Sequence, residues 1–417
     1  MTPLPVTILS GFVGAGRTTV LNHLLASQPD LKIAIIVNSA VGEEQSAATE
    51  SHINVSEAQE HLVELSSGCI CCTLREDLLQ EIVTIAQDGS WDYLLIESSG
   101  VSEPIPIAET FAFVDDAGDA LSEIVRLDTL VTVVDAQKFM EDYMSTEELA
   151  DRNLGAGEDS DDRDISLLLA DQVEFANVVV INKCDLVAAD QLAALKSLVQ
   201  RMNPEALVIE SRFGHVDPSL VMNTNRYSLE WAGQAVEGSG SALEGEAAAT
   251  PENGISGFVF EARRPFHPQR FFDFWMNDEC VNAILRSRGY FWLATRNSLA
   301  GYWSQAGQVL SAEPGGEWWA EAPKEEWPTD EPEMISQIES VWQEPYGDRR
   351  QELVFIGQEM EINSVRAALE ACLLTDEEYG QGPDGWADYE DPFESWDQDF
   401  EDHEHDHDHD CDHDHDH

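Results

Sequence analysis

A glycine-rich segment near the N-terminus has the spacing needed to bind phosphate groups. Residues 11–19 are GFVGAGRTT; they follow a short apolar run and precede a helical pattern that starts at Val20. The segment matches the phosphate-loop pattern GxxxxGK[ST], except that Arg17 occupies the lysine position. Backbone N–H groups of such a loop bind phosphates, and the Thr18 hydroxyl is placed to bind Mg²⁺. The predicted phosphate-binding residues are Gly11, Gly14, Ala15, Gly16, Arg17, Thr18 and Thr19. The alternative is a glycine turn that binds nothing.

A second motif has the chemistry to recognise a guanine base. Asn182, Lys183, Cys184 and Asp185 form an NKxD sequence after the apolar run Val178–Ile181. The Asp185 carboxylate would accept hydrogen bonds from the guanine N1–H and exocyclic amine, a donor pair that adenine lacks. We therefore expect GTP as the ligand rather than ATP. Residues 211–214, SRFG, follow another apolar run and are a weaker candidate to close over the base.

An acidic residue and a glycine follow a third apolar run. Residues 93–100 are YLLIESSG, so Glu97 ends the run and Gly100 lies three positions later. We predict that Glu97 holds Mg²⁺ and that Gly100 contacts the γ-phosphate. With Arg17, these two residues are the predicted catalytic set, and the alternative for Glu97 is a solvated acid at the end of a strand.

Three cysteines within four residues indicate a site for a soft metal ion. Cys69, Cys71 and Cys72 lie between the glycine-rich loop and Glu97. Thiolates select Zn²⁺ or Cu(I), and a structural zinc site has four ligands. Three thiolates leave one position for another group, which suits a site that must release its metal. The alternative is three buried thiols.

The last 15 residues alternate histidine with acids. Such tracts bind metal ions, and imidazole suits Zn²⁺, Ni²⁺, Cu²⁺ and Co²⁺. We interpret this tract as a weak reservoir for several ions that feeds or buffers the cysteine site. The alternative is a tail that only increases solubility. Its predicted ligands are His403, His405, His407, His409, His413, His415 and His417.

Short apolar runs separated by helical lengths predict an α/β domain with a mostly parallel sheet over residues 1–229. The predicted strands are Val6–Leu9, Ile33–Val37, Tyr93–Ile96, Thr129–Val134, Val178–Ile181 and Ala206–Ile209.

Three further parts follow this domain. Residues 230–254 are rich in Gly, Ala, Ser and Glu, which is typical of a flexible linker. Residues 255–375 form a smaller predicted α+β domain, and the acidic residues 376–417 are predicted to be disordered. In the smaller domain we expect strands at 257–262, 290–295 and 353–357 and helices at 268–287 and 364–373.

The charge of the chain excludes several classes of protein. Its 417 residues include 81 Asp and Glu but only 22 Lys and Arg, a formal charge of −59. Such a surface repels nucleic acid and anionic membranes, so neither is an expected partner. The segment from Asp376 holds 19 of the acids and no Lys or Arg, which leaves −40 on the rest. The absence of a basic leader, of a long apolar run and of a disulfide-like cysteine pattern favours a cytoplasmic protein.

Taken in order, GFVGAGRTT, GCICC, ESSGVSEP and NKCD resemble the CobW-like metallochaperone GTPases, relatives of the maturation GTPases of nickel enzymes. Residues 263–268 (RRPFHP) and 288–294 (RGYFWLA) look most like the zinc-linked YciC/ZigA branch. The resemblance implies a phosphate-loop GTPase domain followed by a CobW C-terminal domain. It also implies GTP, Mg²⁺ and Zn²⁺ as ligands, zinc binding by Cys69, Cys71 and Cys72, and coupling of nucleotide state to metal transfer.

Two departures from the family pattern bear on this expectation. Arg17 replaces the loop lysine, so hydrolysis is expected to be slow. After Val37 and Asn38, where the family has an acid, this chain has Ser39, and Glu43 or Glu44 would supply the second family acid. The alternative functions are a nucleotide-binding metal buffer that hydrolyses weakly or not at all, and a cobalt chaperone for cobalamin or nitrile hydratase maturation. Metal-dependent client proteins and a homodimer are the expected partners.

Overall fold

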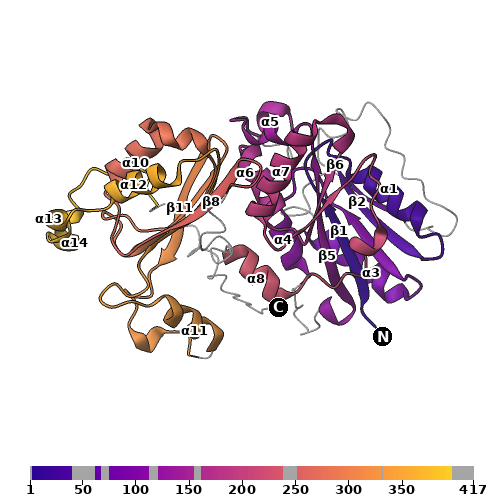
Figure 1. The fold of residues 1–417 in the computed structure, drawn as a ribbon. Coiled ribbons are helices and arrows are strands. Elements are labelled where there is room, and N and C mark those ends of the chain that lie inside the picture. Colours follow the sequence, from indigo (N-terminus) through magenta and orange to yellow (C-terminus); the bar gives the residue numbers. More distant parts are fainter. Residues whose placement is uncertain are drawn as a thin grey trace, which may run out of the picture. The chain divides into compact units, whose positions relative to one another are not determined.

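The computed structural model describes residues 2–39, 62–66, 75–111, 121–154, 161–237, 251–329 and 332–396. These residues form two compact units (Figure 1). The first extends to Gly257 and includes Ala306–Val309, and the second begins at Phe258. Within the described ranges, no helix combines the length and the apolar composition that a membrane span requires.

A seven-stranded sheet forms the centre of the first unit, and the strand pairs are parallel. Its order is β3-β2-β4-β1-β5-β6-β7. The strands are β1 (Leu4–Ser10), β2 (Ile33–Ser39), β3 (Leu62–Ser66), β4 (Tyr93–Glu97), β5 (Val125–Asp135), β6 (Val178–Asn182) and β7 (Leu207–Glu210). The six predicted strands are confirmed, and β3 is an addition that the sequence analysis missed.

Helices connect these strands, because parallel neighbours need a crossover between them. They are α1 (Arg17–Ser27), α3 (Arg75–Asp88), α4 (Pro104–Thr110), α5 (Phe139–Tyr143), α6 (Ile165–Glu174), α7 (Ala189–Met202) and α8 (Leu229–Glu237). Short 3₁₀ turns lie at η1 (Leu121–Glu123), η2 (Ala150–Arg152), η3 (Cys184–Leu186) and η4 (Pro218–Leu220).

The sheet is buried on both faces. Ile8 of β1 packs in one apolar cluster with Ile82 of α3, whereas the next residue, Leu9, packs in the opposite cluster with Leu21 of α1. Successive side chains of a strand point to opposite faces, so this alternation places helices on both sides. Buried parallel strands of this kind are continuous apolar runs, which is why the sequence predicted them correctly.

The carboxyl ends of the parallel strands lie at one edge of the sheet, where open α/β sheets bind ligands. β1 ends at the glycine-rich loop, and β4, β5 and β6 end at Glu97, Asp135 and Asn182. The register pairs Leu9 with Glu97 and Asp135 with Asn182 across neighbouring strands. The fold therefore places the glycine-rich loop, Glu97 and the NKCD motif at one edge of the sheet.

The second unit contains a five-stranded sheet of order β11-β10-β9-β12-β8, in which β9 and β12 are antiparallel. Its strands are β8 (Ile255–Ala262), β9 (Ile284–Phe291), β10 (Leu299–Ala306), β11 (Val309–Glu317) and β12 (Gln351–Gln358). Its helices are α10 (Pro268–Asn277), α11 (Pro332–Val341), α12 (Ile362–Cys372), α13 (Asp376–Tyr379) and α14 (Gly382–Trp386), with 3₁₀ turns η6 (Glu279–Ala283) and η7 (Lys324–Glu326).

The helix predicted over residues 268–287 was too long. α10 ends at Asn277, and the Asp278 side chain accepts a hydrogen bond from the Cys280 N–H and starts a new turn. The chain then forms β9, whose pairing with β12 takes precedence over local helical spacing. The strand predicted at residues 290–295 therefore begins earlier, at Ile284.

The predicted linker 230–254 was also wrong at its N-terminal end. Residues 229–237 form the helix α8, and Trp231 of this helix packs against Phe175 with ring centroids 5.1 Å apart. Burial of one aromatic face outweighs the Gly- and Ala-rich composition that suggested a linker. Residues 238–250 lie outside the described part.

The prediction of disorder from residue 376 needs a similar correction. Residues 376–396 are folded onto the second unit and include two buried tryptophans, Trp386 and Trp396. We call this segment the C-terminal extension. Some of its acids are paired with arginines, as in the Arg270–Glu378 and Arg296–Asp391 ion pairs. The acidic composition therefore led to a predicted start of disorder, residue 376, that was wrong. Residues 397–417 lie outside the described part of the chain.

Candidate nucleotide and metal site

The glycine-rich loop joins β1 to the N-terminus of α1. Gly16, the residue before α1, has φ 104°, and a Cβ there would lie 2.5 Å from the Asn182 side-chain nitrogen. Only glycine fits this close approach. The first turn of α1 has no side-chain cap and no acidic residue, so nothing at this end of the helix opposes the binding of an anion.

Two predicted Mg²⁺ ligands from distant parts of the sequence lie in direct contact. The Thr18 hydroxyl donates a hydrogen bond of 2.7 Å to Oε1 of Glu97, which is buried at the end of β4. A hydroxyl and a carboxylate are the oxygen donors that Mg²⁺ prefers in phosphate sites. The donor set therefore fits the predicted ion.

Arg17 lies against both the loop and the carboxylate. Its Nη1 donates to the Gly11 carbonyl oxygen at 2.9 Å, and its Nε is 3.8 Å from Oε1 of Glu97. The side chain is 9% exposed, so its charge lies inside the site and not on the surface. The guanidinium thus occupies the region where the family lysine is expected.

The guanine motif is physically tied to the phosphate loop. Asn182 Nδ2 donates to the Ala15 carbonyl at 3.1 Å, and its Oδ1 accepts from the Gly214 N–H at 3.1 Å. Lys183 Nζ donates to the Gly14 carbonyl at 2.7 Å. Asp185 is exposed, as expected for a residue that is predicted to contact a base. The structure therefore brings NKCD, the glycine-rich loop and residues 211–214 together.

Asp135 belongs to the same edge, although the sequence analysis missed it. Its carboxylate accepts from Lys183 Nζ at 2.6 Å and from the Gln137 N–H at 2.9 Å. Asp135 holds Lys183 against the loop and so supports the base-binding motif. Its position as an acid at the end of an apolar run, like Glu97, was the available signal.

The segment that follows Glu97 is held by α6. Gln172 Nε2 donates to the carbonyl oxygens of Gly100 and Ser102 at 3.2 and 3.1 Å, and Arg163 Nη1 donates to Oε1 of Glu103 at 2.7 Å. Gly100, the predicted contact of the γ-phosphate, is therefore fixed by a buried amide. No sequence signal marks Gln172, because only folding brings α6 to this segment.

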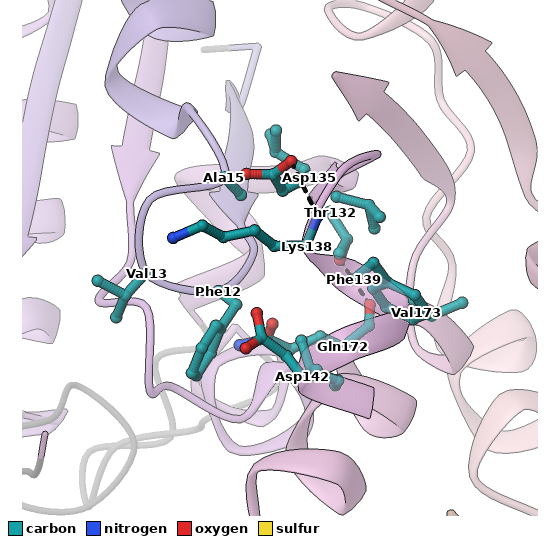
Figure 2. Close-up of a pocket in the computed structure, with 13 residues that line it drawn as sticks. Phe12, Val13, Ala15, Thr132, Asp135, Lys138, Phe139, Asp142, Gln172 and Val173 are labelled. Carbon is teal, nitrogen blue, oxygen red and sulfur yellow. Dashed lines mark hydrogen bonds between the residues drawn. The ribbon is translucent and has the colours of Figure 1, made fainter. Parts of the chain in front are cut away.

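A small pocket lies beside the phosphate loop. Figure 2 shows Phe12 and Val13 from the loop together with Lys138, Asp142 and Gln172 along its wall. Gln172 Oε1 is buried and lacks a hydrogen-bond partner among the described residues. This side chain thus lies between the pocket and the segment that contains Gly100.

The predicted zinc ligands lie outside the described residues: Cys69, Cys71, Cys72, His403, His405, His407, His409, His413, His415 and His417. Glu43 and Glu44 are outside as well, and Ser39 is described only in its backbone. These assignments stay predictions. Within the described ranges, no group of three or more metal-ligating side chains is present.

The described chain nevertheless indicates where the cysteine segment is attached. β3 ends at Ser66, three residues before Cys69, and its neighbour β2 pairs with both β3 and β4. The end of β3 therefore lies at the same edge of the sheet as Glu97. Nearby Asn38 is 1% exposed, and within the described part neither polar atom of its side chain has a hydrogen-bond partner. A buried, unsatisfied amide is rare in native proteins and is consistent with a ligand site at this edge.

Comparison with known proteins agrees with this arrangement. Residues 5–210 match the CobW/HypB/UreG nucleotide-binding domain, and residues 255–373 match the cobalamin synthesis protein cobW C-terminal domain. The chain is 40% identical over 405 residues to the zinc-regulated GTPase metalloprotein activator 1 of Dictyostelium discoideum, covering 94% of this chain and 84% of that protein. It is 31% identical over 232 residues to the zinc chaperone CobW of Pseudomonas aeruginosa, which covers 53% of this chain and 60% of that protein.

Solved structures include a Zn(II)-bound YjiA GTPase from E. coli, with 21% identity and a TM-score of 0.39 over 90% of this chain and 100% of that one. The extent of the match to the Dictyostelium protein and the two domain matches decide the assignment. The phosphate loop, the NKCD motif and the second domain are thus those of a member of the CobW/HypB/UreG family, to which this chain belongs.

Proposed function

We propose that this chain is a GTP-hydrolysing zinc metallochaperone that couples its nucleotide state to the transfer of zinc to client proteins. The observation that carries the proposal is the 2.7 Å contact between Thr18 and Glu97 beside a phosphate loop tied to NKCD. The names of the relatives in Dictyostelium and Pseudomonas, an activator and a zinc chaperone, support zinc as the cargo.

Each described group has a defined task in this proposal. The N–H groups at the start of α1 and the Arg17 guanidinium bind phosphate oxygens, while Thr18 and Glu97 hold Mg²⁺. When bound, Mg²⁺ neutralises charge on the phosphates. Asp185 accepts from the guanine edge, and Lys183 stays in place because Gly14 and Asp135 hold its ammonium group.

The coupling between nucleotide and zinc follows from the order of the segments. Gly100 would report the γ-phosphate, and the cysteine segment continues from β3 at the same sheet edge. A change at Gly100 between GTP and GDP would alter the surroundings of Cys69, Cys71 and Cys72, as nucleotide-sensing segments do in other GTPases. Metal-dependent clients would then receive zinc from one nucleotide state.

The direct test measures zinc content and GTP turnover on one purified sample, beside a variant with Cys69, Cys71 and Cys72 all changed to Ala. The proposal predicts that the native chain hydrolyses GTP, binds zinc at the cysteine site, and changes its turnover when zinc is added. The triple variant should keep GTP binding and lose both the site and the response. Equal zinc responses in the two proteins would overturn the proposal.

A second function is favoured by one observation, the arginine at position 17. Its guanidinium already contacts Gly11 and lies near Glu97, so a nucleotide-binding metal buffer with little hydrolysis is the alternative. Phosphate release separates the two functions, because the buffer binds GTP without releasing phosphate. Competition between Zn²⁺ and Co²⁺ at the cysteine site tests the cobalt alternative on the same sample.

A further inference from the structure

Phe213 combines high exposure with an unfavourable backbone conformation. Its side chain is 69% exposed, more than any other large apolar side chain that the described residues leave exposed. Its φ is 56°, in the left-handed region that a bulky residue rarely adopts. A single exposed apolar residue is common, but an exposed ring on a strained backbone is not explained by packing.

The surrounding contacts keep this conformation in place. The Gly214 N–H donates to Asn182 Oδ1 at 3.1 Å, and the His215 N–H donates to the Arg212 carbonyl at 3.1 Å. Gly214 itself has φ 70°, and a Cβ there would lie 2.8 Å from Thr19 Cγ2. The loop is therefore fixed between the end of β6 and the first turn of α1.

This position adjoins the expected base. β7 pairs with β6, so the residues after β7 and the NKCD motif after β6 share one edge of the sheet. The two segments are joined directly, because the Cys184 N–H donates to the Ser211 carbonyl at 3.1 Å. Asp185, the residue expected to contact the guanine edge, follows Cys184 directly and is exposed.

We propose that Phe213 stacks on the flat face of the guanine ring, and this inference rests on the proposed function. Hydrogen bonds that the Asp185 carboxylate accepts from guanine contact the edge of the base but leave its faces open. A ring held beside that edge supplies an aromatic surface, and base–aromatic stacking strengthens nucleotide binding without contacting the phosphates. The backbone strain at Phe213 is then the cost of placing the ring at the base.

The test compares GDP with inorganic pyrophosphate, which has phosphates but no base, by isothermal titration calorimetry in the presence of Mg²⁺. Phe213→Ala should weaken GDP binding about tenfold, or about 1.4 kcal/mol, and leave pyrophosphate binding unchanged. Phe213→Tyr should retain native GDP affinity, because it keeps the flat ring.

A glycine variant separates stacking from folding. Phe213→Gly relieves the left-handed strain, so its thermal unfolding midpoint should equal or exceed that of the native chain. Its GDP affinity should still fall by about tenfold. A role in packing alone would instead lower the unfolding midpoint and leave GDP affinity intact.

Leu229→Ala is the matched control, since Leu229 is 65% exposed at the start of α8, outside the nucleotide motifs. It should bind GDP as the native chain does. Native GDP affinity in Phe213→Ala, or an equal loss of GDP and pyrophosphate binding, would overturn the inference alone. Failure of the native chain to bind GDP or GTP would overturn the proposed function and the inference with it.

Discussion

Arg17 is the residue at which this chain departs most clearly from the phosphate-loop pattern. The guanidinium contacts the Gly11 carbonyl and lies 3.8 Å from Glu97. A lysine would place a compact charge there, whereas a guanidinium is planar and spreads its charge over three nitrogens. The substitution therefore preserves the positive charge but changes its shape at the site of hydrolysis.

We expect Arg17→Lys to raise the rate of GTP hydrolysis by about tenfold, which is about 1.4 kcal/mol in activation free energy. The compact ammonium group should stabilise the negative charge that develops on the phosphate oxygens in the transition state better than the guanidinium does. Phosphate release under single-turnover conditions measures this rate. Arg17→Ala is the control and should weaken GDP binding. If Arg17→Lys leaves turnover unchanged, the arginine is not what limits hydrolysis.

Short motifs allowed the residues of the phosphate loop and of NKCD to be predicted from sequence. The structure brings these residues together through Asn182, which contacts both the loop and Gly214. Asp135 and Gln172 were missed because their contacts are made only after the strands and α6 have assembled. Asp135 had a usable signal, an acid at the end of an apolar strand, but Gln172 had none.

At the scale of secondary-structure elements, α6 holds the segment that we propose to sense the nucleotide. Gln172 donates to Gly100 and Ser102, and Arg163, just before α6, pairs with Glu103. A movement of Gly100 between nucleotide states must therefore stretch or break contacts with α6. This makes α6 the described element best placed to respond to GTP hydrolysis.

We expect Gln172→Met to lower the catalytic rate about tenfold while GDP affinity stays unchanged. Methionine fills the same volume but cannot donate to the carbonyls of Gly100 and Ser102, so the γ-phosphate contact is no longer held in place. Steady-state hydrolysis and GDP titration measure the two quantities.

Gln200→Met on α7 is the matched control for this variant. Gln200 Nε2 also donates to backbone carbonyls, those of Asn203, Pro204 and Ala206, but away from Gly100. Gln172→Met should lose about 1 kcal/mol of stability per lost hydrogen bond, and Gln200→Met should lose less because Gln200 is exposed. Only Gln172→Met should lose hydrolysis, and equal rates in the two variants would contradict the role given to α6.

The C-terminal extension is held by an ion pair whose pH dependence can be predicted. Arg270 donates to both carboxylate oxygens of Glu378 at 2.8 and 2.7 Å. The Arg270 guanidinium lowers the pKa of Glu378 from 4.5 to about 2. Because the folded pKa is depressed, the pair stabilises the extension fully above pH 4.5, and this stabilisation is lost as the pH falls toward 2.

We expect Glu378→Gln to lower the free energy of unfolding of the second unit by about 1 kcal/mol at neutral pH. The difference from the native chain should shrink as the pH falls below 4.5, the ordinary pKa of this carboxyl. Denaturant titrations at several pH values measure it. Asp376→Asn is the control, because Asp376 is 95% exposed in its ion pair with Arg264 and should have little effect. A pH-independent difference would show that the carboxylate charge is not responsible.

Six of the seven strands of the first unit could be predicted, because burial on both faces makes them continuous apolar runs. β11 of the second unit could not, since it is an edge strand in which none of the residues is buried and which includes Pro314, Gly315 and Gly316. The C-terminal extension was missed for another reason. Its acids suggested disorder, but Trp386 and Trp396 are buried and arginines of the second unit pair with its carboxylates.

On the scale of the whole molecule, the acids that contribute to the charge of −59 lie partly in the folded C-terminal extension and partly beyond it. Of the 19 acids from Asp376 onward, eight lie in the folded extension and 11 follow residue 396. Arginines neutralise Asp376, Glu378 and Asp391 within the extension. The acids after residue 396 alternate mainly with histidines, a composition suited to binding cations.

Removal of residues 403–417 should lower the number of zinc ions bound per chain without changing GDP affinity. Seven histidines can fill about two tetrahedral sites, so a loss of about one to two ions is expected at saturating zinc. Equilibrium dialysis with metal analysis measures the number of ions. An unchanged number would show that the tract does not bind zinc.

The central claim is that one molecule couples its nucleotide state to its zinc site. Linkage requires that any effect of nucleotide on zinc affinity be matched by an equal effect of zinc on nucleotide affinity. The phosphate loop and the end of β3 lie at one edge of the sheet, with the ends of β2 and β4 between them.

The most direct test uses a chain that ends at Asp402, so that the histidine tract does not contribute. Its zinc affinity is measured with a non-hydrolysable GTP analogue and again with GDP, both with Mg²⁺. Our account predicts about a tenfold difference, or about 1.4 kcal/mol, which disappears when Cys69, Cys71 and Cys72 are changed to Ala. Equal zinc affinities in the two nucleotide states would contradict it.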